Sequence, residues 1–183
     1  MTRRHPPLPR LWLMTDERMG DALWPALKRL PKGSGVIFRH HANSAAERRA
    51  LYEAVRRIAR KRSLILILAG SPRQAIGWRA DGSHGRSAHR RAPGPLLRTA
   101  PAHNARELHA ARHADLILLS PAFPTRSHPG APALGRARFG LLAARAKKPV
   151  IALGGMDERR ARSLPGIYGW AAIDAWTRRS ATR

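Results

Sequence analysis

Residues 114–131 of the chain, ADLILLSPAFPTRSHPGA, decide its fold more than any other stretch. They begin with a nearly continuous apolar run, 114–119, which is typical of a strand covered on both faces of a parallel sheet. A polar loop follows the strand directly, at the end where active sites lie in β/α barrels. Four loop side chains are of types that can hold an anionic substrate: Thr125, Arg126, Ser127 and His128. The residues alone leave a second interpretation open, a proline-stiffened connector with incidental polar groups.

Similar apolar runs recur along the chain and, together with the poorly apolar segment 79–84, predict eight strands. They span residues 11–15, 35–38, 63–68, 79–84, 96–97, 114–119, 149–153 and 170–173. Between several of them lie segments rich in Ala, Arg and Leu at helical spacing, at residues 21–30, 45–60, 105–112, 135–146 and 157–163. Strands and helices that alternate at spacings of roughly 20 to 30 residues indicate βα units with right-handed crossovers. Both a barrel and a doubly wound sheet fit this pattern.

We expect an α/β fold, a compact TIM-type (β/α)8 barrel that residues 11–183 form as a single domain behind a basic, proline-rich tail at 1–10. With 183 residues the chain is short for such a barrel. Eight βα units typically need about 250 residues, so helices and loops must be trimmed. The fourth unit is the most reduced, because 79–84 is poorly apolar and 85–94 is rich in Arg, Ser, Pro and Gly. We therefore expect a degenerate fourth βα unit with little or no helix.

The chain is strongly basic, with 35 Lys and Arg against 11 Asp and Glu and a net charge of +24. Such a surface attracts polyanions. The arginines are nevertheless spread through the predicted helices and are not interleaved with stacking aromatic residues, as they often are in nucleic-acid-binding surfaces. This distribution favours a solvated basic face, and nucleic acid is a possible partner through net charge only.

The chain contains no cysteine, which excludes disulfides, thiolate metal sites and a cysteine nucleophile. The apolar run near the N-terminus is too short for a signal peptide or a membrane span. We therefore expect a soluble, cytoplasmic protein without a membrane partner. The sequence does not determine its oligomeric state.

A second informative segment is 150–156, VIALGGM, a strand that runs into a Gly154-Gly155 turn before a helix at Asp157. Such a turn lets backbone amides approach a phosphate, and the seventh strand of a barrel is a usual place for it. If the predicted eighth strand extends beyond its apolar run to 169–175, it carries Asp174 toward the same region. A fixed negative charge disfavours a bound phosphate, so Asp174 faces elsewhere, pairs with an arginine, or marks a site that no longer binds phosphate.

Several segments together resemble the thiamine phosphate synthase and TenI family over most of residues 11–176. The similarity lies at the ends of the predicted strands, in Thr15-Asp16, Phe38-Arg39, 80–84, 102–104, 120–131 and 154–156. The loop at 120–131 is the most specific of these. Family members with synthase activity join a pyrimidine pyrophosphate to a thiazole phosphate with Mg²⁺, so the resemblance implies a role in thiamine biosynthesis or salvage and a small phosphorylated heterocycle as ligand.

The resemblance also implies roles for individual residues. Arg39 and Thr125 match positions on the pyrophosphate side, Ser127 stands where the family often has Thr, and Gly154-Gly155 match the phosphate turn. Elsewhere the chain departs from the family at positions that carry charge: His41 and His128 replace lysines, Ala69-Gly70-Ser71 replaces an Asn-Asp pair, and Ser87 and Ala88 replace a Gln and an acidic residue. Mg²⁺ is therefore a possible cofactor, but its expected carboxylate ligands are missing.

The related TenI activity, a thiazole tautomerisation, needs an acid or base. The family's histidine for this step stands at the place of Pro121 here. Three other histidines are candidates by residue type: His84, His103 and His128. With Arg39 they are the candidate catalytic residues. The alternatives are a synthase-like transferase or tautomerase-like isomerase, a catalytically silent barrel that serves as a ligand-binding or regulatory module, and a basic polyanion binder.

Overall fold

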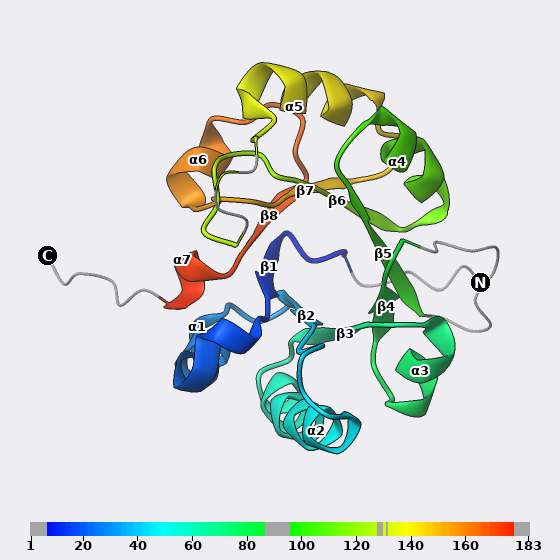
Figure 1. The fold of residues 1–183 in the computed structure, drawn as a ribbon, viewed down its shortest axis with the longest axis vertical. Helices are drawn as coiled ribbons and strands as arrows, with labels where there is room; N and C mark the ends of the chain where they lie inside the picture. Colours follow the sequence, from blue (N-terminus) through cyan, green and yellow to red (C-terminus); the bar gives the residue numbers. More distant parts are fainter. Residues whose placement is uncertain (1–6, 87–95, 128–129, 131, 178–183) are drawn as a thin grey trace, which may run out of the picture.

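The structure is a computed structural model that describes residues 7–86, 96–127, 130 and 132–177. Eight parallel strands close into a barrel in chain order, and β8 pairs with β1 (Figure 1). The predicted (β/α)8 barrel is confirmed, and the doubly wound sheet is excluded. The strands are β1 (Leu11–Met14), β2 (Gly35–Phe38), β3 (Ile65–Ala69), β4 (Gly82–His84), β5 (Leu97–Ala102), β6 (Leu116–Leu119), β7 (Val150–Ala152) and β8 (Gly169–Ala172).

Helices surround the ring of strands (Figure 1). They are α1 (Leu23–Arg29), α2 (Ala45–Lys61), α3 (Pro72–Gly77), α4 (Ala105–Ala110), α5 (Gly135–Arg145), α6 (Glu158–Arg162) and α7 (Asp174–Thr177), with 3-10 helices η1 (Glu17–Ala22) and η2 (Ala111–His113). In the described part of the chain only α2, with 17 residues, and α5, with 11, are longer than seven residues. Short helices are how a chain of this length closes a barrel.

One large side chain, Trp12, fills much of the barrel interior and is fully buried. Its neighbour on β2 is Gly35, where an added Cβ would overlap the Trp12 ring. Gly82 on β4 likewise leaves no room for a Cβ, because the Leu97 carbonyl oxygen occupies that space. Gly35 therefore makes room for the tryptophan on the neighbouring strand, whereas Gly82 lets the backbone of β5 approach β4 closely.

Two further apolar clusters join the outer face of the strands to the helices. The longest helix, α2, begins with a capping box in which the Ser44 hydroxyl accepts from the Glu47 amide and the Glu47 carboxylate accepts from the Ser44 amide. Its apolar face buries Tyr52, Val55 and Ala59 against the barrel. The helix layer thus fixes the strands whose ends carry the polar loops.

Four local predictions differ from the structure. The fourth strand begins at Gly82 and not at 79, because Arg79 has a positive φ of 53°. The fifth strand is longer than 96–97 and continues through the weakly apolar Thr99-Ala-Pro-Ala to residue 102. Helix α3 was not predicted, although the Ser71 hydroxyl caps it by accepting from the Gln74 amide at 3.1 Å. Asp174 begins α7 and is not part of the eighth strand.

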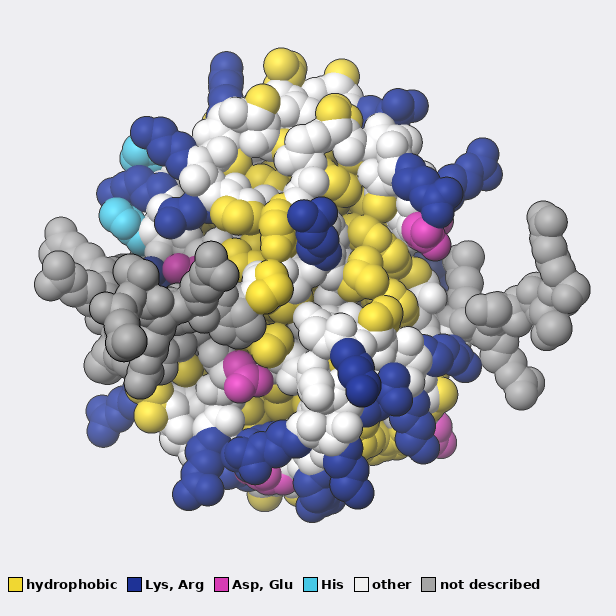
Figure 2. Space-filling view, turned by 180° about the vertical axis from the view of Figure 1, so that it is seen from behind, with side chains coloured by type: hydrophobic (Ala, Val, Ile, Leu, Met, Phe, Trp, Pro, Cys, Tyr) yellow, Lys and Arg dark blue, Asp and Glu magenta, His cyan; other side chains and the backbone are white. Residues whose placement is uncertain are grey.

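The reduced fourth unit is described only in part. Residues 85–86 follow β4 without helix, and residues 87–95 lie outside the described residues. Figure 2 shows many Lys and Arg side chains around the rim of one face of the molecule, with few acidic side chains among them. None of the helices described here is long and apolar enough to cross a membrane.

Candidate functional site

A cavity of about 1100 Å³ opens beside the carboxyl ends of the strands. Six of the residues predicted to act in catalysis or phosphate binding line it: Arg39, His103, Thr125, Ser127, Gly154 and Gly155. They come from four different strand ends, those of β2, β5, β6 and β7. Closing the barrel therefore brings together residues that lie more than a hundred positions apart in the chain.

The Gly154-Gly155 turn packs directly against the β6–α5 loop. The Ala122 amide donates to the Leu153 carbonyl at 2.8 Å, and the Phe123 amide donates to the Gly154 carbonyl at 3.1 Å. An added Cβ at Gly154 would lie 2.7 Å from the Cα of Pro121, and one at Gly155 would overlap the Pro124 carbonyl oxygen. Both positions therefore need glycine, and the two loops form one continuous wall of the cavity.

This turn offers backbone amides to the cavity. Gly154 and Gly155 have positive φ values of 96° and 59°, which ordinary residues rarely adopt. Among the described residues, no acceptor receives a hydrogen bond from the amides of Gly154, Gly155 or Met156, and all three residues line the cavity. Consecutive free amides at such a turn are a common binding arrangement for anions.

The hydroxyl groups of Thr125 and Ser127 in the β6–α5 loop are also set up as donors. The Thr125 oxygen accepts a hydrogen bond from the Ser127 amide at 3.3 Å, and the Ser127 oxygen accepts one from Nη2 of Arg18 at 3.0 Å. Neither hydroxyl proton has an acceptor among the residues that the structure describes. Because each oxygen already accepts from the protein, each O–H remains available to donate to a ligand.

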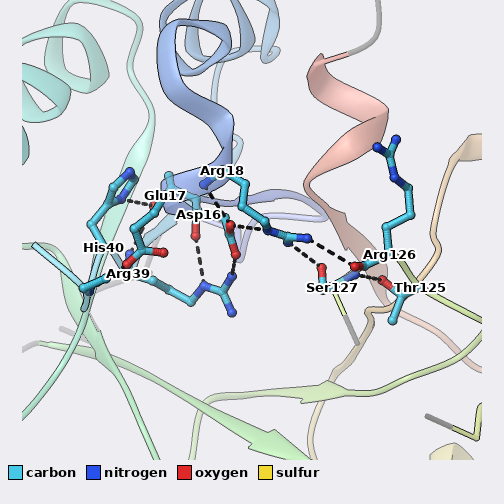
Figure 3. A network of polar contacts seen from close by, with 10 residues as sticks. Asp16, Glu17, Arg18, Arg39, His40, Thr125, Arg126 and Ser127 are labelled. Atoms are coloured by element: carbon cyan, nitrogen blue, oxygen red, sulfur yellow. Dashed lines mark hydrogen bonds and ion pairs between the residues drawn. The ribbon is translucent and has the colours of Figure 1, made fainter. Parts of the chain in front are cut away.

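Asp16 holds two arginines at the rim of the barrel (Figure 3). Its Oδ2 contacts Nη2 of Arg39, and its Oδ1 accepts from Nε of Arg18 at 2.6 Å. Burial alone would raise the pKa of Asp16, but the hydrogen bonds from Arg18 and the charges of Arg39 and Arg18 together lower it. The carboxylate therefore stays ionised and fixes both guanidinium groups.

The two arginines differ in what they leave free. Arg39 uses Nη2 on Asp16 and donates from Nε to the Thr15 carbonyl at 2.9 Å, so its Nη1 has no acceptor in the described part of the chain. Arg18 engages all three of its nitrogens, on Asp16, on the Arg126 carbonyl and on Ser127. Arg39 lines the cavity and can therefore contact a ligand, whereas Arg18 bonds the protein through each of its nitrogens and is not among the cavity-lining residues.

The three candidate histidines have different surroundings. At the cavity, Nδ1 of His103 lies 2.6 Å from the Glu107 carboxylate, and this hydrogen bond lowers the pKa of Glu107. His84 is not among the cavity-lining residues; its Nδ1 lies 2.9 Å from the Thr99 hydroxyl, and burial lowers its pKa to about 4. His84 is therefore neutral at physiological pH. The third candidate, His128, lies outside the described residues.

Asp174 lies at the cavity and close to Arg18. The hydrogen bond that Arg18 donates to Asp16 is the main cause that raises the pKa of Arg18, and the charge of Asp174 raises it further. No hydrogen bond or ion pair to its carboxylate occurs within the described ranges. The carboxylate thus adds negative charge beside a guanidinium group that already belongs to the Asp16 network.

Known proteins resemble the chain over nearly its full length. A family model described as "Thiamine monophosphate synthase" matches residues 11–175. The chain belongs to this family. It is 29% identical over 181 residues to "Putative thiamine-phosphate synthase 2" of Aquifex aeolicus (strain VF5), covering 91% of this chain and 96% of that protein.

Several solved structures have the same fold as this chain. The thiamine phosphate pyrophosphorylase from Pyrococcus furiosus superposes with a TM-score of 0.73 at 21% identity, over 94% of this chain and 89% of that one. The thiamine phosphate pyrophosphorylase from Bacteroides thetaiotaomicron gives a TM-score of 0.59 at 17% identity, over 94% and 87% of the two chains. The YdjI aldolase from Escherichia coli K12 shares only the general barrel, with a TM-score of 0.57 at 10% identity over 90% and 75%.

The residues present at this family's metal positions do not fit a carboxylate-held Mg²⁺. Ala69 and Gly70 stand at the end of β3 and carry no donor side chain, and the Ser71 hydroxyl is used to cap α3. Ser87 and Ala88 lie outside the described residues. Within the described residues no group of three or more His, Asp or Glu side chains could hold a metal ion. Mg²⁺ is normally held by oxygen ligands, which include one or two carboxylates. The binding of Mg²⁺ to this chain is a prediction that no observation tests.

Sequence reasoning missed two residues that organise the site. Asp16 was noted only as part of a family pattern, and Arg18 was not noted at all. The partners of Arg18 in the β6–α5 loop are 108 and 109 positions away in the chain. A basic residue in a chain with 35 Lys and Arg gives no signal of such a contact.

Proposed function

We propose that this divergent member of the thiamine monophosphate synthase family binds a phosphorylated thiazole, or a similar small phosphate, at the C-terminal face of its barrel, as part of thiamine biosynthesis or salvage. The observation that carries the proposal is the set of hydrogen-bond donors among the residues that line the cavity. The free amides of Gly154 and Gly155, the hydroxyls of Thr125 and Ser127 and one nitrogen of Arg39 are all donors.

A phosphate suits such a set of donors because its oxygens only need to accept. Each hydrogen bond to a charged group contributes about 1.5–3 kcal/mol, so a few of them together give a stable complex without a metal ion. The proposal therefore rests on the chain's own donors. What the missing carboxylates weaken is the stabilisation of a departing pyrophosphate, which is a separate requirement of the synthase reaction.

A second candidate function, proton transfer as in a thiazole tautomerisation, is favoured by the His103–Glu107 pair. With its Nδ1 bonded to a carboxylate, His103 keeps Nε2 available as a base at the edge of the cavity. His84 is less suited to this role because it is not among the residues that line the cavity. The transferase and isomerase functions share the phosphate site and differ in the chemistry beside it.

Titration of the purified protein with thiazole phosphate tests the binding proposal. Replacing both hydroxyls in a T125A/S127A variant should weaken binding by about tenfold or more, because two charge-assisted hydrogen bonds are lost. An S163A variant, in which a hydroxyl bonded to the Arg160 carbonyl is removed, is the matched control. Equal affinity of wild type and T125A/S127A would contradict the proposal.

Turnover assays then separate the two chemistries. Formation of thiamine phosphate from thiazole phosphate, pyrimidine pyrophosphate and Mg²⁺ would establish transferase activity. Conversion between thiazole tautomers that is lost in an H103Q variant would establish the isomerase function. Binding without either reaction would leave the ligand-binding or regulatory module.

A further inference from the structure

Arg18 connects two loops that come from distant parts of the chain. It lies in η1, just after β1, and its side chain reaches across to the β6–α5 loop (Figure 3). At the near end, Nε donates to Asp16 at 2.6 Å. At the far end, Nη1 donates to the Arg126 carbonyl at 3.2 Å and Nη2 to the Ser127 hydroxyl at 3.0 Å. One guanidinium group therefore joins the start of the barrel to its most specific loop.

The anchor of this connection is rigid. The Asp16 carboxylate contacts the side chain of Arg39. It also accepts hydrogen bonds from the backbone amide of Arg18, at 3.1 Å, and from the Arg18 side chain. The Asp16 side chain is only 11% exposed, whereas that of Arg18 is 52% exposed. An exposed arginine normally samples many conformations, and here three hydrogen-bonded nitrogens select one.

The far end of the connection acts on a group that faces the cavity. Nη2 of Arg18 occupies an acceptor direction of the Ser127 oxygen, which directs the Ser127 proton elsewhere. Nη1 at the same time holds the peptide between Ser127 and the preceding Arg126. Arg18 therefore fixes both the position of the loop and the direction in which Ser127 donates.

We propose that Arg18 is a positioning residue for the anion-binding loop: it acts through Ser127 and does not contact the ligand itself. This inference rests on the proposed function, because it assumes that Ser127 donates to a phosphate oxygen of the ligand. The group that Arg18 prepares the loop to meet is a phosphate or pyrophosphate oxygen, which accepts the oriented O–H. Arg39, with a free nitrogen, remains the arginine that contacts the anion.

Hydrogen–deuterium exchange of the amides in residues 120–127 tests the connection without any ligand. An R18A variant should exchange these amides about tenfold faster than wild type, because the loop loses two hydrogen bonds. R49A is the matched control, since Arg49 on α2 also pairs with one carboxylate, Glu53 at 2.7 Å, and its side chain is 40% exposed. Equal exchange in R18A and R49A would overturn the proposal.

Inorganic pyrophosphate titrations of R18A, S127A and R18A/S127A test whether Arg18 acts through Ser127. Each single variant should bind about tenfold more weakly than wild type, and the double variant should bind little more weakly than S127A alone. Independent, additive losses would mean that Arg18 acts by its charge or contacts the anion, and would overturn the proposal.

An R18K variant separates geometry from charge. Lysine keeps the positive charge but has one nitrogen, so it cannot bond Asp16 and both loop groups at once. R18K should therefore lose nearly as much pyrophosphate affinity as R18A, whereas wild-type affinity in R18K would overturn the positioning role. If wild-type protein binds neither pyrophosphate nor thiazole phosphate, the proposed function fails. The hydrogen–deuterium exchange of amides 120–127 in R18A, compared with R49A, still decides whether Arg18 fixes the loop.

Discussion

Substitution of Gly155 by alanine gives a sharp test of the wall formed by the two loops. Gly155 has a φ of 59°, and a left-handed conformation costs an alanine about 1–2 kcal/mol. The new Cβ would also overlap the Pro124 carbonyl oxygen, so the β6–α5 loop must move to make room. A displacement of about 1 Å at a binding site can weaken function by about a hundredfold.

Gly166, between α6 and β8, provides the matched control. Its φ is 71°, close to that of Gly155, but no atom lies within 4 Å of the place where its Cβ would be. G166A should therefore lose only about 1–2 kcal/mol of unfolding free energy and keep wild-type affinity for thiazole phosphate. G155A should lose more stability and bind at least about tenfold more weakly.

Urea unfolding and calorimetric titration of the two variants measure both effects. Both substitutions place an alanine at a positive φ, so this backbone cost is common to the two variants. The difference between them therefore measures the effect of the clash between residue 155 and the β6–α5 loop. If G155A and G166A lose equal stability and both bind as wild type does, the contact between the Gly-Gly turn and the loop does not support the site, and the reasoning is refuted.

Three further predictions concern the fold and its pH dependence. G35A should lower the free energy of unfolding by about 1–3 kcal/mol in a urea titration, because the new methyl group overpacks Trp12, and an unchanged midpoint would contradict this. Burial lowers the pKa of His84 from 6.5 to about 4, so the unfolded state binds a proton at a higher pH than the folded state does. The free energy of unfolding should therefore be greatest above pH 6.5 and should fall as the pH decreases toward 4. This decrease in the free energy of unfolding is at most about 3 kcal/mol. An H84N variant should not show it when unfolding is measured as a function of pH. R48M should lose about 1–3 kcal/mol, since Arg48 donates to two strand-end carbonyls at 2.8 Å, and R49M on the same helix should lose less.

The fold could be predicted from the sequence because its strongest signals are local. The run at 114–119 contains β6, which is buried along its whole length from Leu116 to Leu119, and the Gly154-Gly155 turn follows β7 as expected. Weak signals produced the errors. Thr99-Ala-Pro-Ala in β5 is not apolar enough to predict a strand from its residues alone, and it pairs because β4 and β6 lie on either side of it.

The site could be predicted only where one segment carries its own signal. Thr125, Ser127 and the two glycines belong to motifs that can be read within a few residues. Arg18 cannot be found in this way, since its role depends on a loop more than a hundred residues later. The lowered pKa of His84 likewise comes from its place in the barrel and not from its neighbours in sequence.

A calorimetric titration with two matched ligands tests the central claim most directly. The ligands are thiazole phosphate and the same thiazole alcohol without its phosphate. If the donors of the cavity wall hold a phosphate, the phosphorylated ligand should bind about a hundredfold more tightly, which corresponds to about 2.7 kcal/mol. Equal affinity for the two ligands, or no binding of either by folded protein, would contradict the account.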